Sequence, residues 1–471
     1  MHSKGHEAAH AGEHLHGLED MPPIMTHEEV SRDVIGRFTA VSWRYMAVMG
    51  VLALLFAIGL VAFVIRAVGG FDDTSDWGYF VATMGFLTTA FVSAPIVSAG
   101  LRFTKAHWRR PLARLAEIHG VTALLVLLMV IPALAALPDP VGRADIWFDF
   151  PSPDWFPHMW TMIAMAALAL CTVALLWMHA LPDLANARDH LPQGKVRRNV
   201  ASFLSMGVIG TVRFWRVLYR GGLLLGALYI MMYMAVQTIL SAEWSLGMVP
   251  SWKDSMFPAY QVMKGLQAGT AVVVVTMFVL RTWGGYEKYF GIDQFWSIAK
   301  PLLAFSLLWF YMWFASFITF WYGRQPSEIN LIQMLFLGPW AVPFFSSMLL
   351  NFLFPLGMFI WNPIRKSIVG PTVVAAAVLL GALIDQVRVY VAPMSLNNHF
   401  GHVLAEVPVF QWPNILDIAI VVGFISGAIL LFTLVAKLVP VVSIWEVGEG
   451  LRLVKVRKFH NRWVRVIAKS H

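Results

Sequence analysis

The stretch from Tyr45 to Ile65 reads YMAVMGVLALLFAIGLVAFVI and contains no charged residue. Roughly 20 apolar residues suffice to cross a bilayer, and in lipid such a stretch satisfies its backbone groups only as a helix. About ten runs of this kind follow one another along the chain. We therefore predict an all-α, polytopic membrane protein with about ten transmembrane helices, at residues 38–68, 78–103, 111–137, 159–183, 221–241, 256–281, 295–322, 329–361, 369–391 and 416–439.

The composition excludes a soluble protein. Of the 471 residues, 58% are hydrophobic and only 13% are charged, whereas a soluble domain carries about 25% charged residues. Water cannot solvate the surface that such a chain would present, so the lipid bilayer is its first expected partner.

The charges alternate between the connections that join these spans. Lys and Arg concentrate in the connections after the second, fourth and eighth spans and again in the C-terminal tail, whereas the connections between them are acidic. Basic connections stay in the cytoplasm, which predicts a multi-pass protein with both termini cytoplasmic. The formal net charge of +8 then reflects topology and anionic lipid headgroups, with no nucleic-acid partner. The basic residues are Arg102, Lys105, Arg109, Arg110 and Arg114, then Arg188, Lys195, Arg197, Arg198, Arg213, Arg216 and Arg220, then Arg365 and Lys366, then Lys455, Arg457, Lys458, Arg462, Arg465 and Lys469.

Three parts of the chain follow from this pattern: a His-rich cytoplasmic N-terminal arm at 1–37, a ten-helix membrane domain at 38–440, and a basic cytoplasmic C-terminal tail at 441–471. The arm has two interpretations. Its histidines favour metal binding, but their spacing fits no compact site, so an arm that only docks on a partner is the simpler interpretation. We predict no metal site.

The redox cofactors that this chain could hold are limited by its ligands. Cys171 is the only cysteine, so the chain cannot ligate an iron–sulfur cluster through cysteines. A haem would need a His from each of two helices, and only His119 and His179 lie well within predicted spans. Because a His near a helix end more often bonds a neighbour, we expect no haem in this chain.

Ionisable residues inside the spans are costly, and they are the best pointers to function. The third span carries Glu117 and His119, the sixth Lys264, and the ninth Asp385 and Arg388. Asp385 and Arg388 are three residues apart, so they lie on one helix face and can form an ion pair. Lys264 has no evident acidic partner in the sequence. Two interpretations stay open for these five residues: a proton path, or buried pairs that only fix helix register.

The connection after the third span mixes carboxylates, one arginine and aromatic residues. It contains Arg143, Asp145 and Asp149, and His158 follows at the outer rim of the fourth span. A quinone headgroup needs a stacking surface, a donor to its carbonyl, and a carboxylate or His to take its proton. An interfacial aromatic belt would have a similar composition.

Several motifs resemble the large membrane subunits of alternative complex III, within the NrfD-like family typified by the membrane subunit of polysulfide reductase. Their order and spacing cover nearly the whole chain. The motifs are LPDLANARD at 181–189, GKVRR at 194–198, GTVRFW at 210–215, PSWKDSMFPAY at 250–260, EKYFG at 287–291 and WYG at 321–323.

This resemblance implies two four-helix bundles, from spans two to five and six to nine, with the remaining spans peripheral. It also implies a subunit of a quinol-oxidising complex in the bacterial cytoplasmic membrane. Quinol, of the menaquinone type or similar, would bind near the outer face, and its electrons would pass to an extrinsic iron–sulfur subunit. A paralogous NrfD-like membrane subunit and a multihaem cytochrome c subunit would be further partners.

The chain departs from the family pattern at the quinol site. The family has a His early in the second span and a His-Val-Gly-Arg stretch after the third. Here the second span reads SAPIVSAG at 93–100, and the later stretch reads PVGR at 140–143. Either His158, Asp145 or Asp149 accepts the proton, with Arg143 as donor to the headgroup, or the chain is a scaffold paralogue that has lost quinol binding.

A proton-coupled secondary transporter is the alternative from another class. The sequence GPWAVP at 338–343 interrupts the eighth span, as in the broken helices of transporters. The other half of the chain shows no matching interruption, which favours the electron-transfer subunit.

Overall fold

The computed structural model describes residues 25–138, 156–191, 196–459 and 462–467. Within these ranges ten helical segments are long and apolar enough to cross a membrane, which confirms the predicted all-α, polytopic fold. Their bounds are Trp43–Val68, Thr74–Phe103, Ala113–Ala135, His158–His190, Val212–Met248, Phe257–Thr282, Ile292–Gly323, Ala341–Ile360, Val369–Met394 and Ile415–Val435.

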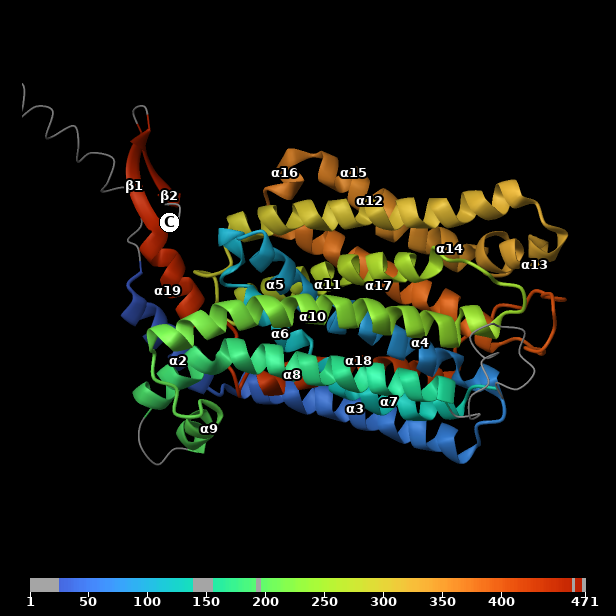
Figure 1. Ribbon diagram of the computed structural model, residues 1–471, viewed down its shortest axis with the longest axis horizontal. Helices are drawn as coiled ribbons and strands as arrows, with labels where there is room; N and C mark the ends of the chain where they lie inside the picture. Colours follow the sequence, from blue (N-terminus) through green and yellow to red (C-terminus); the bar gives the residue numbers. More distant parts are fainter. Residues whose placement is uncertain (1–24, 139–155, 192–195, 460–461, 468–471) are drawn as a thin grey trace, which may run out of the picture.

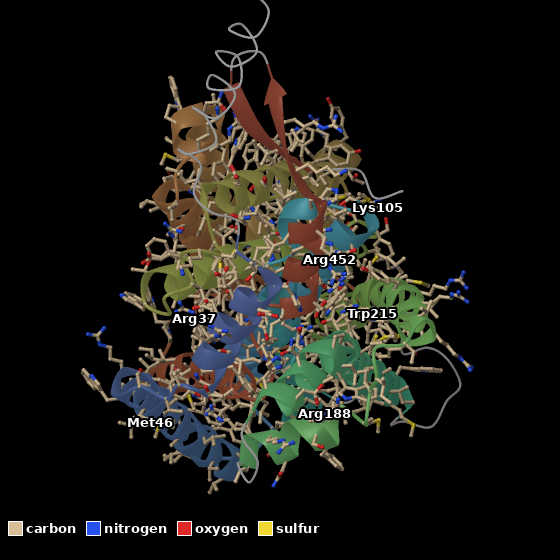
Figure 2. All side chains as sticks on the ribbon, turned by 90° about the vertical axis from the view of Figure 1, so that its left-hand side faces the viewer. Arg37, Met46, Lys105, Arg188, Trp215 and Arg452 are labelled. Carbon is tan, nitrogen blue, oxygen red and sulfur yellow. The ribbon has the colours of Figure 1, made fainter. Side chains whose placement is uncertain are left out.

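The spans lie side by side in one elongated bundle (Figure 1). The end at the left of Figure 1 carries the terminal segments and the connections rich in Lys and Arg, and we call it the basic end. The other end is called the opposite end. Figure 2 views the basic end, where Arg37, Lys105, Arg188 and Arg452 are labelled.

The second to fifth spans form a first group of helices. The second span is α4, η2 and α5, and the third is α6 and α7. The fourth is α8, and the fifth is α10 followed by η4. Helix α8 packs on α7 and α10, and α5 packs on α6 and α10. The bounds are α4 Gly78–Leu87, η2 Thr88–Val92, α5 Ala94–Phe103, α6 Ala113–His119, α7 Thr122–Ala135, α8 Phe156–His190, α10 Val212–Trp244 and η4 Leu246–Met248.

The sixth to ninth spans form a second group. The sixth span is α11, the seventh is α12 and the ninth is α17, and the predicted eighth span corresponds to α13 through α15. Helix α11 packs on α12 and α17, and α14 packs on α17. The bounds are α11 Phe257–Thr282, α12 Ile292–Gly323, α13 Ile329–Ile332, η6 Gln333–Leu337, α14 Ala341–Met348, η7 Leu349–Leu353, α15 Phe354–Ile360 and α17 Val369–Met394.

The second span joins the two groups, because α4 packs on α17 while η2 and α5 pack on α11. It is also the most enclosed span, with 94% of its apolar window buried. Its helix widens into a π-turn at η2 just before Pro95, a residue that cannot donate a backbone hydrogen bond. The polar side chains of this span therefore face protein on all sides.

The first and tenth spans, α3 (Trp43–Val68) and α18 (Ile415–Val435), pack on each other at the edge of the bundle. A Cβ atom on Gly59 or on Gly423 would overlap the backbone of the other helix, so the close approach requires both glycines. Arg66 on α3 forms an ion pair of 2.9 Å with Asp417 on α18. This pair of helices is the peripheral part of the fold.

The predicted eighth span at 329–361 is broken where the sequence reads GPW at 338–340, as expected from its Gly and Pro residues. The part beyond the break, Ala341–Ile360, is the segment long and apolar enough to cross a membrane. The π-turn η6 ends there, and α14 begins at Ala341. A second π-turn, η7, follows before α15.

The terminal segments pack together at the basic end. Helix α2 (His27–Thr39) begins in the segment predicted as an arm and ends two residues beyond it, and it packs on α19 (Ile444–Leu453) of the tail. Ser31 of α2 donates a hydrogen bond of 2.8 Å to Asn186 of α8. The hairpin of β1 (Val454–Phe459) and β2 (Arg462–Ile467) is antiparallel, with Val454 opposite Ile467. The remaining short elements are η1 Thr74–Trp77, η3 His107–Arg109, α9 Val196–Leu204, η5 Pro326–Glu328 and α16 Asn362–Arg365.

The fifth span is longer than its apolar part. Helix α10 begins at Val212, nine residues before the predicted start at 221, and Thr211 caps it by accepting a hydrogen bond from the Phe214 amide. Arg213, Arg216 and Arg220 therefore lie on helical turns and not in a loop. Long basic side chains are tolerated at helix ends because they reach the interface.

Candidate functional site

Asp385 on α17 holds a buried ion cluster together with residues of α11. The Nζ of Lys264 lies 2.6 Å from Asp385 Oδ2, and the Tyr260 hydroxyl donates to the same oxygen at 2.5 Å. The predicted pair with Arg388 is present, with Nη2 2.7 Å from Oδ1. Lys264 and Asp385 are fully buried. We call these four residues the Asp385 cluster. In it one carboxylate faces two cations.

The Asp385 cluster also holds the broken eighth span in place. Arg388 Nη1 donates a hydrogen bond of 2.8 Å to the Leu335 carbonyl, just before the break. Ser347 of α14, beyond the break, lies 3.5 Å from Asp385 Oδ1. A carbonyl exposed by a helix break is costly when it is buried without a donor. Arg388 therefore serves both the carboxylate and the broken helix.

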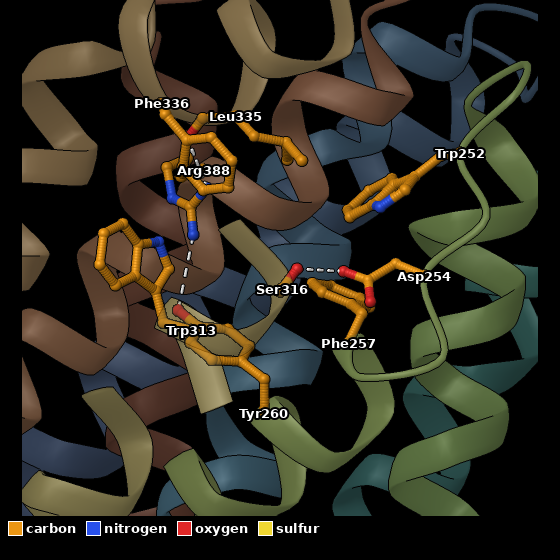
Figure 3. Close-up of a pocket in the computed structure, with 9 residues that line it drawn as sticks. All are labelled: Trp252, Asp254, Phe257, Tyr260, Trp313, Ser316, Leu335, Phe336 and Arg388. Atoms are coloured by element: carbon orange, nitrogen blue, oxygen red, sulfur yellow. Dashed lines mark hydrogen bonds between the residues drawn. The ribbon is translucent and has the colours of Figure 1, made fainter. Parts of the chain in front are cut away.

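A small cavity lies beside this cluster, toward the opposite end (Figure 3). It is lined by Trp252, Asp254, Tyr260, Trp313 and Arg388, among others, and Asp254 accepts a hydrogen bond from Ser316. About 20 Å³ can be reached by the centre of a water molecule, which is room for about one. The cavity connects the Asp385 cluster with a carboxylate that precedes α11.

Glu117 on α6 is the centre of a second buried ion cluster, near the basic end. Its Oε1 accepts hydrogen bonds from Ser98 and Arg102, each at 2.9 Å, and lies 2.8 Å from Nδ1 of His179. Arg114, one turn earlier on α6, has its Nε 3.4 Å from Oε2. The second, third and fourth spans therefore meet at one carboxylate.

Two further carboxylates complete this cluster. Arg102 lies 2.6 Å from Glu446 of α19, which also pairs with Arg109. Arg114 lies 3.1 Å from Asp183 of α8. Three arginines and three carboxylates thus balance in charge, and we call them, with His179 and Ser98, the Glu117 cluster. Burial raises the pKa of the Glu446 carboxyl, but Arg102 and Arg109 outweigh burial and hold that pKa below its ordinary value.

His119 does not join Glu117, although both were predicted for one proton path. Its Nε2 lies 2.9 Å from the Thr276 hydroxyl of α11, and its ring stacks on Phe432 of α18 with centroids 4.3 Å apart. Residues two apart on a helix face different sides. The structure instead places His179 of the fourth span against Glu117.

A line of buried polar side chains on the second span lies between the two clusters. Lys264 Nζ lies 3.4 Å from the amide oxygen of Gln386, and the Gln386 amide nitrogen donates to the Thr89 hydroxyl. Ser93 donates to the Thr89 carbonyl at 2.6 Å, and Ser98 reaches Glu117. Thr89 and Ser98 are nine residues apart, which is about 14 Å along a helix. We call Thr89, Ser93 and Ser98 the span-two polar line.

Other polar groups surround this line. A Cβ atom on Gly265 would overlap the Tyr233 hydroxyl, and one on Gly269 would overlap the Ser93 hydroxyl, so these glycines of α11 admit both hydroxyls. The amide groups of Gln237 and Gln261 are buried and have no hydrogen-bond partner among the described residues. Polar atoms of this kind are commonly satisfied by internal water.

The predicted quinone-binding residues are described only in part. Arg143, Asp145 and Asp149 lie outside the described residues. His158, at the opposite end of α8, has its Nδ1 3.6 Å from Oε1 of Glu243 on α10, and Glu243 is fully buried. Glu243 falls in the connection between the predicted fifth and sixth spans, at 221–241 and 256–281, so the sequence did not indicate it as a partner of His158. This carboxylate and His158 form a pair that could take up a proton.

No protein-family model matches this chain, and no curated protein matches it either.

Proposed function

We propose that this chain is the proton-conducting membrane subunit of a quinol-oxidising complex of the alternative complex III type. One observation carries the proposal: two buried ion clusters near different ends of the bundle, with the span-two polar line between them. Buried ionisable groups in a membrane are costly and commonly mark ion or proton pathways. The motif resemblance described above supplies the quinol and the complex.

In this proposal the two clusters are the inner parts of two half-channels. The cavity at Asp254 leads to the Asp385 cluster from the opposite end, which is the outer side of the membrane. At the basic, cytoplasmic end, Arg114 links Glu117 to Asp183, and Asp183 lines a larger cavity with Asn186 and Trp445. About 360 Å³ of that cavity can be reached by the centre of a water molecule, enough for several.

Quinol would bind at the outer end of the first group of helices. Arg143 would donate to a headgroup oxygen, and the His158–Glu243 pair, Asp145 or Asp149 would accept the proton released on oxidation. The electrons would leave for an extrinsic iron–sulfur subunit. The paralogous membrane subunit and the multihaem cytochrome c subunit would complete the complex in the bacterial cytoplasmic membrane, with both termini of this chain cytoplasmic.

The test uses two neighbouring threonines of the second span in the intact complex. Thr89→Val removes the hydroxyl that accepts from Gln386, whereas Thr88→Val removes one that, in the described part of the chain, bonds only the Met84 carbonyl of its own helix. Both residues are fully buried, so the substitutions are matched in packing. Quinol-driven proton translocation is measured in reconstituted vesicles. We expect Thr89→Val to lower the number of protons moved per quinol while Thr88→Val leaves it unchanged.

Equal translocation by both variants and by Glu117→Gln would contradict proton conduction along this line. Quinone content tests the other half of the proposal. Complex purified in mild detergent is expected to contain stoichiometric quinone that is lost in Arg143→Ala. Partners retained without quinone would instead identify a scaffold paralogue.

A proton-coupled secondary transporter is the second candidate, and the broken eighth span favours it. In that case the cavity of Figure 3 would be the start of a substrate site, because Arg388 joins the break to the buried carboxylate. Uptake of a solute by vesicles that contain this chain alone, without quinol, would support it.

A further inference from the structure

A second cavity at the basic end borders the Glu117 cluster, because Arg102, Arg109 and His179 of that cluster are among its lining residues. It is lined by residues of the second connection and of α10, and about 210 Å³ of it can be reached by the centre of a water molecule. Four cationic side chains line it: Arg102, Lys105, Arg109 and Arg110. Only one carboxylate, Glu449, lines it with them. The cavity wall is therefore rich in cationic donors, of which Arg102 and Arg109 pair with Glu446 and Arg110 pairs with Glu449.

Each of the three arginines keeps an N–H donor that no nearby carboxylate in the described part of the chain accepts from. The side chains of Arg102, Arg109 and Arg110 are each only about a tenth exposed, at 9%, 11% and 9%. The Nε of each is buried and has no hydrogen-bond partner among the described residues. Buried guanidinium groups with spare donors favour an additional anion with several oxygens.

Lys105 is the exposed cation of this wall (Figure 2). It follows α5 in the left-handed region, with φ of 53°, where glycine is the usual residue. The Ala106 amide bonds the Leu101 carbonyl at 3.0 Å, which closes the turn around it. No ion pair is formed by Lys105 among the described residues, so its charge is available at the cavity.

The other wall of the cavity is formed by α10, which faces lipid on its outer side. Leu218, Gly222 and Leu223 of α10 line it, and Leu223 is 43% exposed. Leu224 beside it is 72% exposed, on a helix that spans the membrane. This is where the apolar stretch of α10 begins, so cationic donors and hydrocarbon-facing surface meet at one level. A ligand with an anionic head and apolar tails matches both walls.

We infer that this cavity binds the phosphate headgroup of an anionic phospholipid, whose acyl chains lie along the exposed face of α10. A free phosphate would satisfy the cations but would leave the apolar wall unused. The headgroup would also contact Arg102 and Arg109, which both pair with Glu446, and so fasten α19 to the membrane bundle.

The experiment measures lipid binding by the full chain, delipidated in mild detergent, by native mass spectrometry. Phosphatidylglycerol is titrated into the parent protein, Lys105→Glu and Lys105→Met. Lys366→Glu is the matched control, because Lys366 is an exposed lysine of another basic connection. We expect one tightly held phosphatidylglycerol in the parent, an affinity about tenfold lower in Lys105→Glu, a smaller loss in Lys105→Met, and no loss in the control.

Three results would overturn the inference. The first is equal affinity in the parent and in both Lys105 variants, with thermal unfolding in detergent showing that the variants are folded. The second is equal retention of phosphatidylcholine, which would show that negative charge is not selected. The third is displacement of the lipid by inorganic phosphate at similar concentration, which would identify a site for a free anion.

Discussion

The Asp385 cluster and the Glu117 cluster both neutralise buried charges, but they differ in the number of carboxylates and in where the partners come from. Each buries carboxylates and cations that the membrane would otherwise exclude. In the Asp385 cluster a single carboxylate serves Lys264 and Arg388, and every partner lies within a span. In the Glu117 cluster three carboxylates share three arginines, and one of them, Glu446, comes from α19 outside the spans. Loss of its one carboxylate would leave the cations of the Asp385 cluster without an acidic partner. In the Glu117 cluster, Arg102 and Arg114 each have a second carboxylate, and Glu446 connects the bundle to the tail.

The largest effect is expected from Asp385→Ala. Lys264 and Arg388 would be left buried without a carboxylate, and breaking a buried pair in this way costs about 3–5 kcal/mol. Thermal unfolding of the protein in mild detergent measures it. Glu117→Ala is expected to cost less, because Arg102 keeps Glu446 and Arg114 keeps Asp183. Equal losses of stability in the two variants would show that the remaining carboxylates, Glu446 and Asp183, do not compensate for the loss of Glu117.

Lys264→Met removes a cation from the Asp385 cluster and leaves its carboxylate. Asp385 keeps Arg388 and the Tyr260 hydroxyl, so the expected loss is about 1–3 kcal/mol, smaller than for Asp385→Ala. Unfolding in the same detergent measures it. The control is Lys300→Met, an exposed lysine on α12 that is expected to stay within about 0.5 kcal/mol of the parent. A loss equal to that of Asp385→Ala would show that Arg388 alone cannot hold the carboxylate.

Glu446→Gln tests the connection to the tail through its pH dependence. The pKa of Glu446 is lower in the folded protein than its ordinary value of 4.5, so its charge stabilises the fold fully above that value. This stabilisation is lost as the pH falls through the folded pKa. At pH 7 the variant is expected to be less stable by about 1–3 kcal/mol, with the difference from the parent shrinking below pH 4.5. A difference that is independent of pH would assign the loss to packing.

The smallest effect is expected at the surface. Asp33 and Arg37 of α2 form a pair one turn apart at 3.0 Å, with side chains that are about a quarter exposed. Burial raises the pKa of Asp33, but the bonds from Arg37 and Tyr289 bring it below its ordinary value. Asp33→Asn is expected to cost about 0.2–1 kcal/mol, and less at high salt. A loss as large as that of Lys264→Met would mean that α2 is held as firmly as the spans.

The sequence predicted what depends on local pattern. The ten spans follow from hydropathy, and the Asp385–Arg388 pair follows from helical periodicity over three residues. The pair of Lys264 with Asp385 could not be predicted, because 121 residues separate the two and nothing local relates them. Whether these groups conduct protons, and whether Arg143 and its neighbours bind quinol, stay predictions.

Some missed residues did leave a signal. Glu446 was counted within a basic tail, yet the apolar run that contains Val441, Val442, Ile444 and Trp445 indicates burial of that segment. Thr89 and Ser93 are four residues apart on a span, which places both on one helix face. His179 stood out in the sequence only as a possible haem ligand, and its contact with Glu117 could not be predicted because it depends on how two helices rotate against each other.

The pairing of α3 with α18 constrains how the chain is made. Among the ten described spans α3 is made before the others, and only 11% of its apolar window is buried in the folded protein. Its main packing partner, α18, is the tenth of these spans in chain order. Before α18 is made, Gly59 lacks its contact with the backbone of Gly423, and Arg66 lacks its ion pair with Asp417. The nascent protein must therefore hold α3 in lipid while the eight spans between α3 and α18 are made, and the α3–α18 edge forms only when α18 has been inserted.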